Sequence, residues 1–262
     1  MHLPDSDVEK RPEVLHDFIR QNPLGILTTA IKSDSYPFLQ SSHIPWIIDT
    51  DFDCNANGLG RLRGHIARQN SQAKAIIESC TGNIKSPAKV FLEHDVLIVF
   101  NGPVDHYVTP KFYKQTKPIT GKVAPTWNYE AVELYGKAKV YYDTRSAGSD
   151  SFLTKQLADL SEHMETSIMG FGKTPGTQPW KVADAPDQYI QLLKKNIIGI
   201  EVEITSMSGR FKWSQEKPVG DRAGVVEGFK NLRTPNSTLL SERVEKQAAL
   251  FDANKAAKKS NV

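Results

Sequence analysis

Three short segments of this sequence gather hydrogen-bond donors, small residues and aromatic rings at the ends of predicted elements. Residues 41–46 (SSHIPW) lie in a predicted strand, residues 64–70 (GHIARQN) cover a strand-to-helix passage, and residues 125–129 (PTWNY) enter a long predicted strand. Polar groups at such places are costly to bury unless a partner satisfies them. The three segments therefore indicate a ligand pocket.

The residue types in these segments suit a flat, phosphorylated ligand. The guanidinium of Arg68 can bind a phosphate through a bidentate fork, and nearby hydroxyls can add hydrogen bonds. Trp127 or Trp46 would then flank a flat ring. The candidate hydroxyls belong to Thr28, Thr29, Ser41 and Ser42.

The alternative is that these residues are structural. His43 and His65 would then be half-buried histidines with ordinary partners, and Trp127 and Tyr129 would be core aromatics, as most aromatic residues are. The residues alone name no ligand. The sequence contains no G-x-G-x-x-G, Walker, H-E-x-x-H, C-x-x-C or G-x-S-x-G motif, so the commonest cofactor and catalytic sites are not indicated.

The predicted elements that position these segments are mostly strands in hairpin order. Because the strands do not alternate one-for-one with helices, an antiparallel barrel with added helices is favoured over a doubly wound parallel sheet. The expected fold class is therefore α+β, with mainly antiparallel β structure. Strands are expected at 24–31, 38–48, 62–65, 89–100, 127–142 and 198–204, followed by a turn at 208–209 and a strand at 210–214. Helices are expected at 12–22, 66–80, 150–164 (capped by Asp150), 187–195 and 241–251, with a frayed tail at 254–262.

Side-chain alternation along residues 127–142 bears on Trp127. Val132 and Leu134 fall on one face of this predicted strand, and Glu133 and Lys137 fall on the other. Parity places Trp127 on the polar face. We therefore expect a ligand or a partner to cover its ring, unless a break in the pleat turns the ring into the core.

Composition narrows the function classes. The 262 residues carry 33 Lys and Arg against 30 Asp and Glu, a net charge of +3 that is too small to indicate a nucleic-acid footprint. The longest apolar run covers residues 96–100, whereas a membrane span needs about 20 residues. Asp5, Asp7 and Glu9 near the start, with no apolar stretch beside them, lead us to expect no secretory signal. We therefore expect a cytoplasmic protein, with the nucleus left open, and free thiols at Cys54 and Cys80.

The motifs, taken in order, resemble one known family. They are S-H-I-P at 42–45, G-H-I-A-R-Q-N at 64–70, F-N-G-P at 100–103, Y-V-T-P at 107–110, P-T-W-N-Y at 125–129 and K-W-S-Q at 212–215. Together they are similar to the PaiB-type FMN-binding negative transcriptional regulator family. The resemblance implies a flavin-binding split β-barrel, as a homodimer with FMN near the subunit interface.

The resemblance also extends the set of candidate cofactor-binding residues. Beyond the residues already named, it adds Asn70, Thr126, Lys212, Ser214 and Gln215. Trp180, in a segment rich in Gly and Pro, is a candidate to reach across a dimer. We expect residues 1–215 to form the split-barrel domain, with N-terminal and inserted helices, and residues 216–262 to form a partly helical extension. No metal site is expected.

Three functions remain open from the sequence. The first is an FMN-binding flavoprotein that acts on a small molecule, and an FMN-dependent oxidoreductase if it is an enzyme, because the cofactor would supply the chemistry. The second is a transcriptional regulator of the PaiB type, for which binding to nucleic acid has little support in the charge balance. The third is a protein that binds or degrades haem through one of seven histidines.

Overall fold

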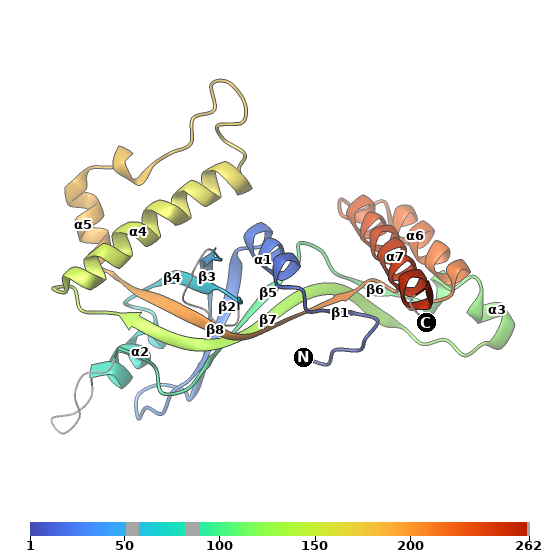
Figure 1. The fold of residues 1–262 in the computed structure, drawn as a ribbon, viewed down its shortest axis with the longest axis horizontal. Coiled ribbons are helices and arrows are strands. Elements are labelled where there is room, and N and C mark those ends of the chain that lie inside the picture. The colour runs from blue at the N-terminus through green and yellow to red at the C-terminus, as the bar shows by residue number, and fades with distance from the viewer. Residues whose placement is uncertain (51–57, 82–89, 261–262) are drawn as a thin grey trace. The chain divides into compact units, whose positions relative to one another are not determined.

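A computed structural model describes residues 1–50, 58–81 and 90–260 (Figure 1). The chain forms two compact units. We call Arg11–Phe100 with Glu133–Met207 the barrel unit, and Met1–Lys10, Asn101–Val132 and Ser208–Val262 the terminal unit. Cys80 is a buried thiol, and the predicted thiol at Cys54 lies outside the described residues.

The barrel unit is a closed antiparallel barrel of six strands. The strands follow the order β8-β4-β3-β2-β5-β7, and the pairing of β7 with β8 closes the ring. Strands β7 and β8 are long because each continues from this unit into the terminal unit. The six strands are β2 (Leu24–Ala30), β3 (Leu39–Asp49), β4 (Arg61–Ala67), β5 (Val96–Asn101), β7 (Thr126–Tyr141) and β8 (Ile197–Lys212).

The largest of the side chains buried inside the barrel is that of Trp46. Trp46 is 1% exposed, so it is a core residue, and the prediction that it flanks a ligand ring is wrong. Its indole fits because Gly64 lies opposite: a Cβ at Gly64 would stand 2.7 Å from the Trp46 ring. Gly25 leaves room in the same way for Phe100 and Trp46.

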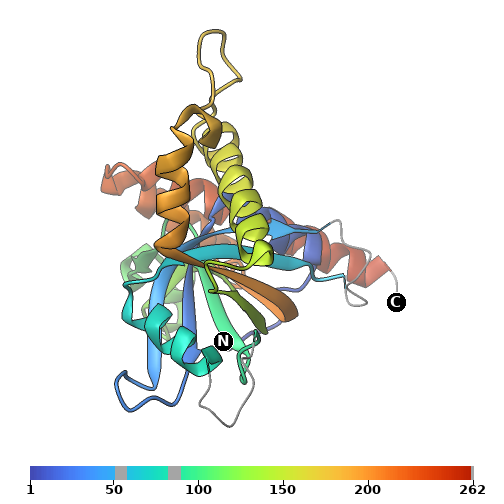
Figure 2. The same ribbon diagram turned by 90° about the vertical axis from the view of Figure 1, so that its left-hand side faces the viewer.

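The helices of the barrel unit lie on the outside of its strands. They are α1 (Pro12–Gln21), α2 (Ser71–Thr81), α4 (Ala147–His163), which a π-turn extends at Met164–Ile168, and α5 (Asp187–Lys195). Figure 2 shows α4 and α5 along one side of the strands and α2 on another. Buried Arg63 on β4 holds α4 in place, because it donates to Asp49 at 2.6 and 2.8 Å and to Asp159 on α4 at 2.6 Å.

The terminal unit packs helices on short strands. Its core is a cluster that includes Tyr113, Trp213 and Phe229. The register pairs β6 with the start of β7 and β1 with the end of β8. Its further elements are β1 (Val8–Glu9), β6 (His106–Val108), α3 (Thr116–Thr120), α6 (Val219–Leu232) and α7 (Ser237–Ser260).

The structure corrects several predicted boundaries. Strand β8 runs through the predicted turn at 208–209, because Gly209 pairs with Glu9 on β1. Helix α6 was not predicted, since its buried Val225 and Phe229 stand among glycines; Gly224 and Gly228 allow the helix to pack closely on Phe112.

Two predicted helix ends also change. Helix α7 continues to Ser260, so residues 254–260 are helical and not a frayed tail. Helix α4 begins at Ala147, which places Asp150 in its first turn, where it pairs with Lys194 and does not cap the helix. No helix of the described chain is long and apolar enough to cross a membrane.

Candidate functional site

On the barrel unit, two of the predicted hydroxyls form an accessible pair. Thr28 on β2 pairs with Ser41 on β3 in the strand register, and their Oγ atoms lie 2.8 Å apart. His43 follows on the same face of β3 and is exposed. This pair keeps hydrogen-bonding capacity for a ligand, so its predicted role in phosphate binding stays a prediction.

Three other predicted polar residues of the barrel unit hold helix α2. The side chain of Asn70 accepts from the backbone N–H of Gln72 at 2.8 Å, which caps the start of α2, and it donates to Ser42 Oγ at 3.0 Å. Gln72 Nε2 donates to the Thr29 hydroxyl at 3.0 Å and to the backbone oxygens of Leu27 and Gln40. Thr29, Ser42 and Asn70 therefore have a structural role, whatever else they contact.

Arg68 bonds to the backbone at both ends of an inserted segment, and we call these bonds the Arg68 clasp. Residues 143–196 leave the barrel after Tyr142 and return to it at Ile197, and this insertion carries α4 and α5. The Arg68 guanidinium donates to the carbonyl of Tyr142 at 2.6 Å and to that of Lys195 at 3.2 Å, and the Arg68 backbone N–H donates to Asn196 at 2.8 Å. The predicted phosphate fork is thus already occupied by backbone oxygens, and phosphate binding by Arg68 stays a prediction.

His65 and Trp180 complete the predicted set in the barrel unit. His65 is half-buried, its Nδ1 is buried with no hydrogen-bond partner among the described residues, and burial lowers the pKa of the imidazole. Trp180 lies in the insertion, is 46% exposed, and donates its backbone N–H to Glu165 at 3.0 Å. Burial therefore favours the neutral form of the His65 imidazole. The ring of Trp180 is accessible to solvent.

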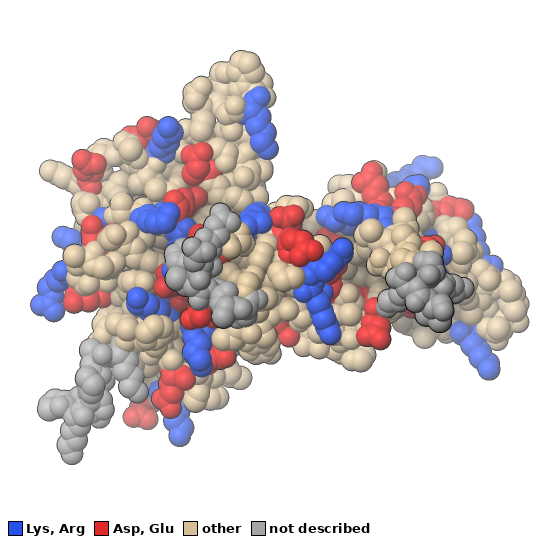
Figure 3. Space-filling model, in the orientation of Figure 1, with Lys and Arg blue, Asp and Glu red and all other residues tan. Residues whose placement is uncertain are grey.

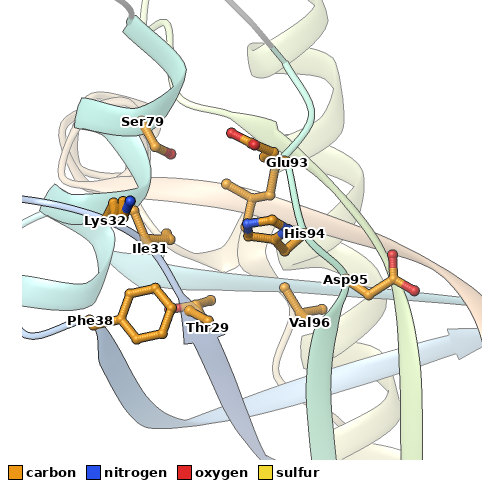
Figure 4. Close-up of a pocket in the computed structure, with 11 residues that line it drawn as sticks. Thr29, Ile31, Lys32, Phe38, Ser79, Glu93, His94, Asp95 and Val96 are labelled. Carbon is orange, nitrogen blue, oxygen red and sulfur yellow. The ribbon is translucent and has the colours of Figure 1, made fainter.

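The barrel unit also has a shallow hollow of about 420 Å³ at one end of the barrel. Figure 4 shows Ser79, Lys32 and Phe38 on one side of it and Glu93, His94 and Asp95 on the other. Of the predicted site residues, Thr29 alone lines this hollow. No group of three or more His, Cys, Asp or Glu side chains in the described parts of the chain is arranged to hold a metal ion.

In the terminal unit, Trp127 presents an oriented and accessible ring. It is 50% exposed, so the prediction that it lies on the polar face of its strand, outside the core, is confirmed. Its Nε1 donates to Asp105 at 2.7 Å. Tyr107 pairs with it across β6 and β7, with the two ring centroids 6.2 Å apart and the rings edge to face. The ring is therefore fixed in direction while half of its surface stays open.

Two cations lie on strand β8 in the same unit. Lys212 donates its Nζ to the hydroxyl of Thr126, the residue before Trp127, so these two predicted residues meet. Burial and the neighbouring Arg210 lower the pKa of Lys212. Arg210 lies 5.6 Å from the ring centroid of Tyr129 and donates to the buried carboxylate of Asp7 at 3.1 and 3.3 Å. Thr126 and Trp127 are successive residues of β7, so Lys212 and the ring of Trp127 lie in the same unit but on opposite faces of this strand.

Ser214 and Gln215 are buried parts of a turn. Ser214 has a positive φ of 60° and donates its hydroxyl to Asn128 at 3.0 Å. Gln215 Nε2 donates to the carbonyl of Phe211 at 2.6 Å, and its Oε1 accepts from the backbone N–H of Trp213 at 2.6 Å. These bonds end β8 and seat the core residue Trp213. The cofactor contacts that the resemblance implies for both residues stay predictions.

Sequence reasoning missed four residues that shape these groups. Tyr107, Asp105 and Arg210 orient or flank the rings of the terminal unit, and Gln72 anchors α2. The Y-V-T-P motif at residues 107–110 indicates the family, but it does not predict that Tyr107 contacts Trp127. That contact depends on the register between β6 and β7, which alternation within one strand cannot supply.

Comparisons with known proteins agree with this architecture. Residues 1–206 match the family described as "Putative FMN-binding domain". An uncharacterized Aspergillus fumigatus protein is 52% identical over 96% of this chain and 99% of its own length. The Bacillus subtilis "Protease synthase and sporulation protein PAI 2" is 23% identical over 94% of this chain and 97% of its own.

The solved structures are less similar to this chain than these relatives are. The flavocytochrome Anf3 from Azotobacter vinelandii is 11% identical, with a TM-score of 0.42, over 80% of this chain and 72% of its own. That overlap is too low to support an argument about function. The match of the family to residues 1–206, together with the long, closely similar fungal relative, carries the assignment: this chain belongs to the "Putative FMN-binding domain" family.

Proposed function

We propose that this protein binds FMN through the terminal unit and acts as an FMN-dependent oxidoreductase. The observation that carries the proposal is Trp127, whose ring is half-exposed and oriented by Asp105 and Tyr107. Aromatic rings pack well against flat conjugated ligands, and FMN also carries a phosphate that cations can bind. The family to which the chain belongs supports a flavin as the ligand.

The residues of this group fit a flat anionic cofactor. Trp127 and Tyr107 would contact the ring system, and Lys212 would supply positive charge for the phosphate, whereas Arg210 is already paired with Asp7. Thr126, held by Lys212, would add a hydroxyl. A bound flavin supplies redox chemistry through its ring, while the protein binds and orients it.

We further propose a homodimer. The ring of Trp127 stays half-open in a single chain, and so does that of Trp180 in the insertion. A ligand or another subunit would cover these rings and remove their apolar surface from water. A second copy would shield a bound cofactor from solvent, as the family resemblance implies.

The absorption spectrum of the purified protein tests the cofactor. Bands in the blue and near-ultraviolet mean a flavin, whereas a strong Soret band would favour the haem alternative. FMN titrated into the apo-protein should bind about tenfold more weakly to Trp127→Ala, since stacking on one aromatic ring contributes on the order of 1–3 kcal/mol.

The matched control is Tyr135→Ala. Tyr135 is a 41% exposed aromatic residue of the same strand, on the barrel unit, and its loss should leave the dissociation constant unchanged. Equal affinities of wild type and Trp127→Ala would contradict the site. Specific binding of duplex DNA with no bound flavin would favour the regulator alternative.

A further inference from the structure

The hollow of about 420 Å³ at one end of the barrel unit has walls that hydrogen bonds hold in place. On one side, the Ile31 N–H donates to the carbonyl of Phe38 at 2.9 Å, which closes the hairpin between β2 and β3. The Ser33 hydroxyl of this hairpin donates to Glu78 on α2 at 3.2 Å. On the other side, the Leu92 N–H donates to a carbonyl of β7 at 2.9 Å. A ligand would therefore meet a preformed surface, which lowers the cost of binding.

Part of the lining of this hollow is apolar. Val96 and Ile31 are core residues, 1% and 9% exposed, and the ring of Phe38 lies beside the hollow and is 54% exposed (Figure 4). Contact with an apolar group of a ligand would remove both surfaces from water. The volume is near the lower end of the range of about 300–1,000 Å³ that ligand pockets occupy. The hollow therefore suits a small molecule with an apolar part.

Charged side chains of both signs line the same hollow. Figure 4 shows Lys32 on the side of the hairpin, and Glu93 and His94 on the opposite side. None of these three side chains forms a hydrogen bond or ion pair with a residue that the structure describes. Asp95 differs, because it accepts from Lys137 on β7 at 2.7 Å. Within the described chain, the ammonium of Lys32 and the carboxylate of Glu93 are thus available to a ligand.

Ser79 adds a hydrogen-bond acceptor to the lining. Its hydroxyl donates to the carbonyl of Ile76 in its own helix at 2.8 Å, which leaves the lone pairs of the oxygen available. An ammonium group has three donors and suits the acceptors Ser79 and Glu93. A carboxylate suits the Nζ of Lys32.

The balance of charge argues against a ligand of a single sign. An anion that bound Lys32 alone would be repelled by Glu93 and Asp95, and a cation that bound Glu93 alone would be repelled by Lys32. Acidic and basic side chains are also intermingled over the face of the barrel unit seen in Figure 3, so this face has no field of one sign to attract a simple ion. A ligand that carries both charges matches the lining.

We propose that the hollow binds a small zwitterion with an apolar side chain, the chemistry of an apolar α-amino acid or dipeptide. Its carboxylate accepts from Lys32, its ammonium donates to Glu93 and Ser79, and its side chain packs on Phe38. The site lies wholly in the barrel unit and needs no flavin. It therefore goes beyond the proposed function and does not depend on it.

The test is an NMR titration of the isotope-labelled, full-length protein with four probes. L-Phenylalanine and glycyl-L-phenylalanine carry both charges, phenylpropionate lacks the ammonium, and phenethylamine lacks the carboxylate. We expect the zwitterions to shift the amide signals of Ile31, Ser79 and Val96. At least one zwitterion should bind about fivefold more tightly than either singly charged probe, because each exposed charge pair contributes modestly. The tighter of the two zwitterions shows which source of this chemistry the hollow prefers.

Variants of the charged side chains locate the binding. Lys32→Met and Glu93→Gln should each weaken binding of the zwitterion about fivefold, since each removes one charge pair. The matched controls are Lys74→Met on α2 and Glu13→Gln on α1, which remove exposed charges that do not line the hollow. Both controls should keep the wild-type dissociation constant.

Three results would overturn the proposal. They are amide signals that do not move with millimolar zwitterion, a singly charged probe that binds as tightly as the zwitterions, and a control variant that loses as much affinity as Lys32→Met. Absence of flavin from a protein that binds the zwitterion contradicts the proposed function and leaves this site standing. A flavin-loaded protein whose amide signals ignore the zwitterion overturns the site alone.

Discussion

In the barrel unit, the arginine that most resembles a phosphate ligand is occupied with backbone carbonyls, whereas in the terminal unit the tryptophan predicted to lie outside the core is open to solvent. Arg68 binds the carbonyls of Tyr142 and Lys195, and Trp127 is half-exposed and held by Asp105. The difference teaches that residue type alone does not identify the site. What matters is how much of a side chain's bonding capacity the fold has already used.

The largest expected effect concerns the ion network of the barrel unit. Arg63→Met leaves the carboxylates of Asp49 and Asp159 without their buried partner, which should cost about 3–5 kcal/mol in the free energy of unfolding. Urea unfolding measures it. Lys155→Met is the control, because Lys155 binds Asp159 from an exposed position and should cost less than about 1 kcal/mol. Equal costs would show that α4 does not depend on Arg63.

Alanine variants of Trp213 and Trp127 should distinguish a core residue from a ligand-binding residue in the terminal unit. Trp213 is 0% exposed, so Trp213→Ala should cost about 3–5 kcal/mol of stability. Trp127→Ala should cost no more than about 1 kcal/mol in the apo-protein, since it removes one exposed hydrogen bond and little burial. Thermal unfolding of both apo-proteins gives the comparison. A large loss for Trp127→Ala would make it a structural residue.

Arg68→Ala tests whether Arg68 binds a phosphate or has only a structural role in the barrel unit. We expect a loss of about 1–3 kcal/mol, because the variant removes charge-assisted bonds to two carbonyls that lie more than seventy residues away in sequence. FMN titration of the same variant tests the phosphate role predicted from sequence. A stable variant with weakened FMN binding would support the sequence-based role, and a destabilised variant with unchanged affinity would support the clasp.

The smallest effect is a pH dependence from His65. Burial holds its folded-state pKa below the ordinary 6.5, so as the pH falls the unfolded chain takes up a proton before the folded chain does. Stability from this group is present above pH 6.5 and declines as the pH falls toward the folded-state pKa. His65→Gln should therefore lose less stability than wild type between about pH 7.5 and about pH 5.5.

The control for that comparison is His43→Gln, since His43 is exposed on the outer face of β3. It should follow the wild-type curve. A His65→Gln protein whose stability falls as steeply as that of wild type would show that other groups account for the whole pH dependence.

The sequence predicted the fold better than it predicted the site. Alternation placed Val132 and Leu134 inside and Trp127 outside, because a strand's parity is local. The hairpin order of the predicted strands indicated the antiparallel barrel, and the family motifs indicated the family that matches residues 1–206. The partners of Arg68 could not be predicted, since Tyr142 and Lys195 come close to it only once the insertion has closed. Helix α6 could not be predicted from the hydrophobic pattern, because its close packing depends on glycines, which carry no hydrophobic signal.

Strand β8 and the two helices that follow it have a consequence for synthesis of the protein on the ribosome. Residues 197–207 close the barrel, and residues 208–262 complete the terminal unit. Both units thus need β8, so neither can be completed before this strand has been synthesised. Until β8 emerges, β4 and β7 each present an unpaired edge, the kind of surface that invites aggregation. Shielding of the β4 and β7 edges therefore matters most before β8 emerges, and the barrel can close as soon as this strand is available.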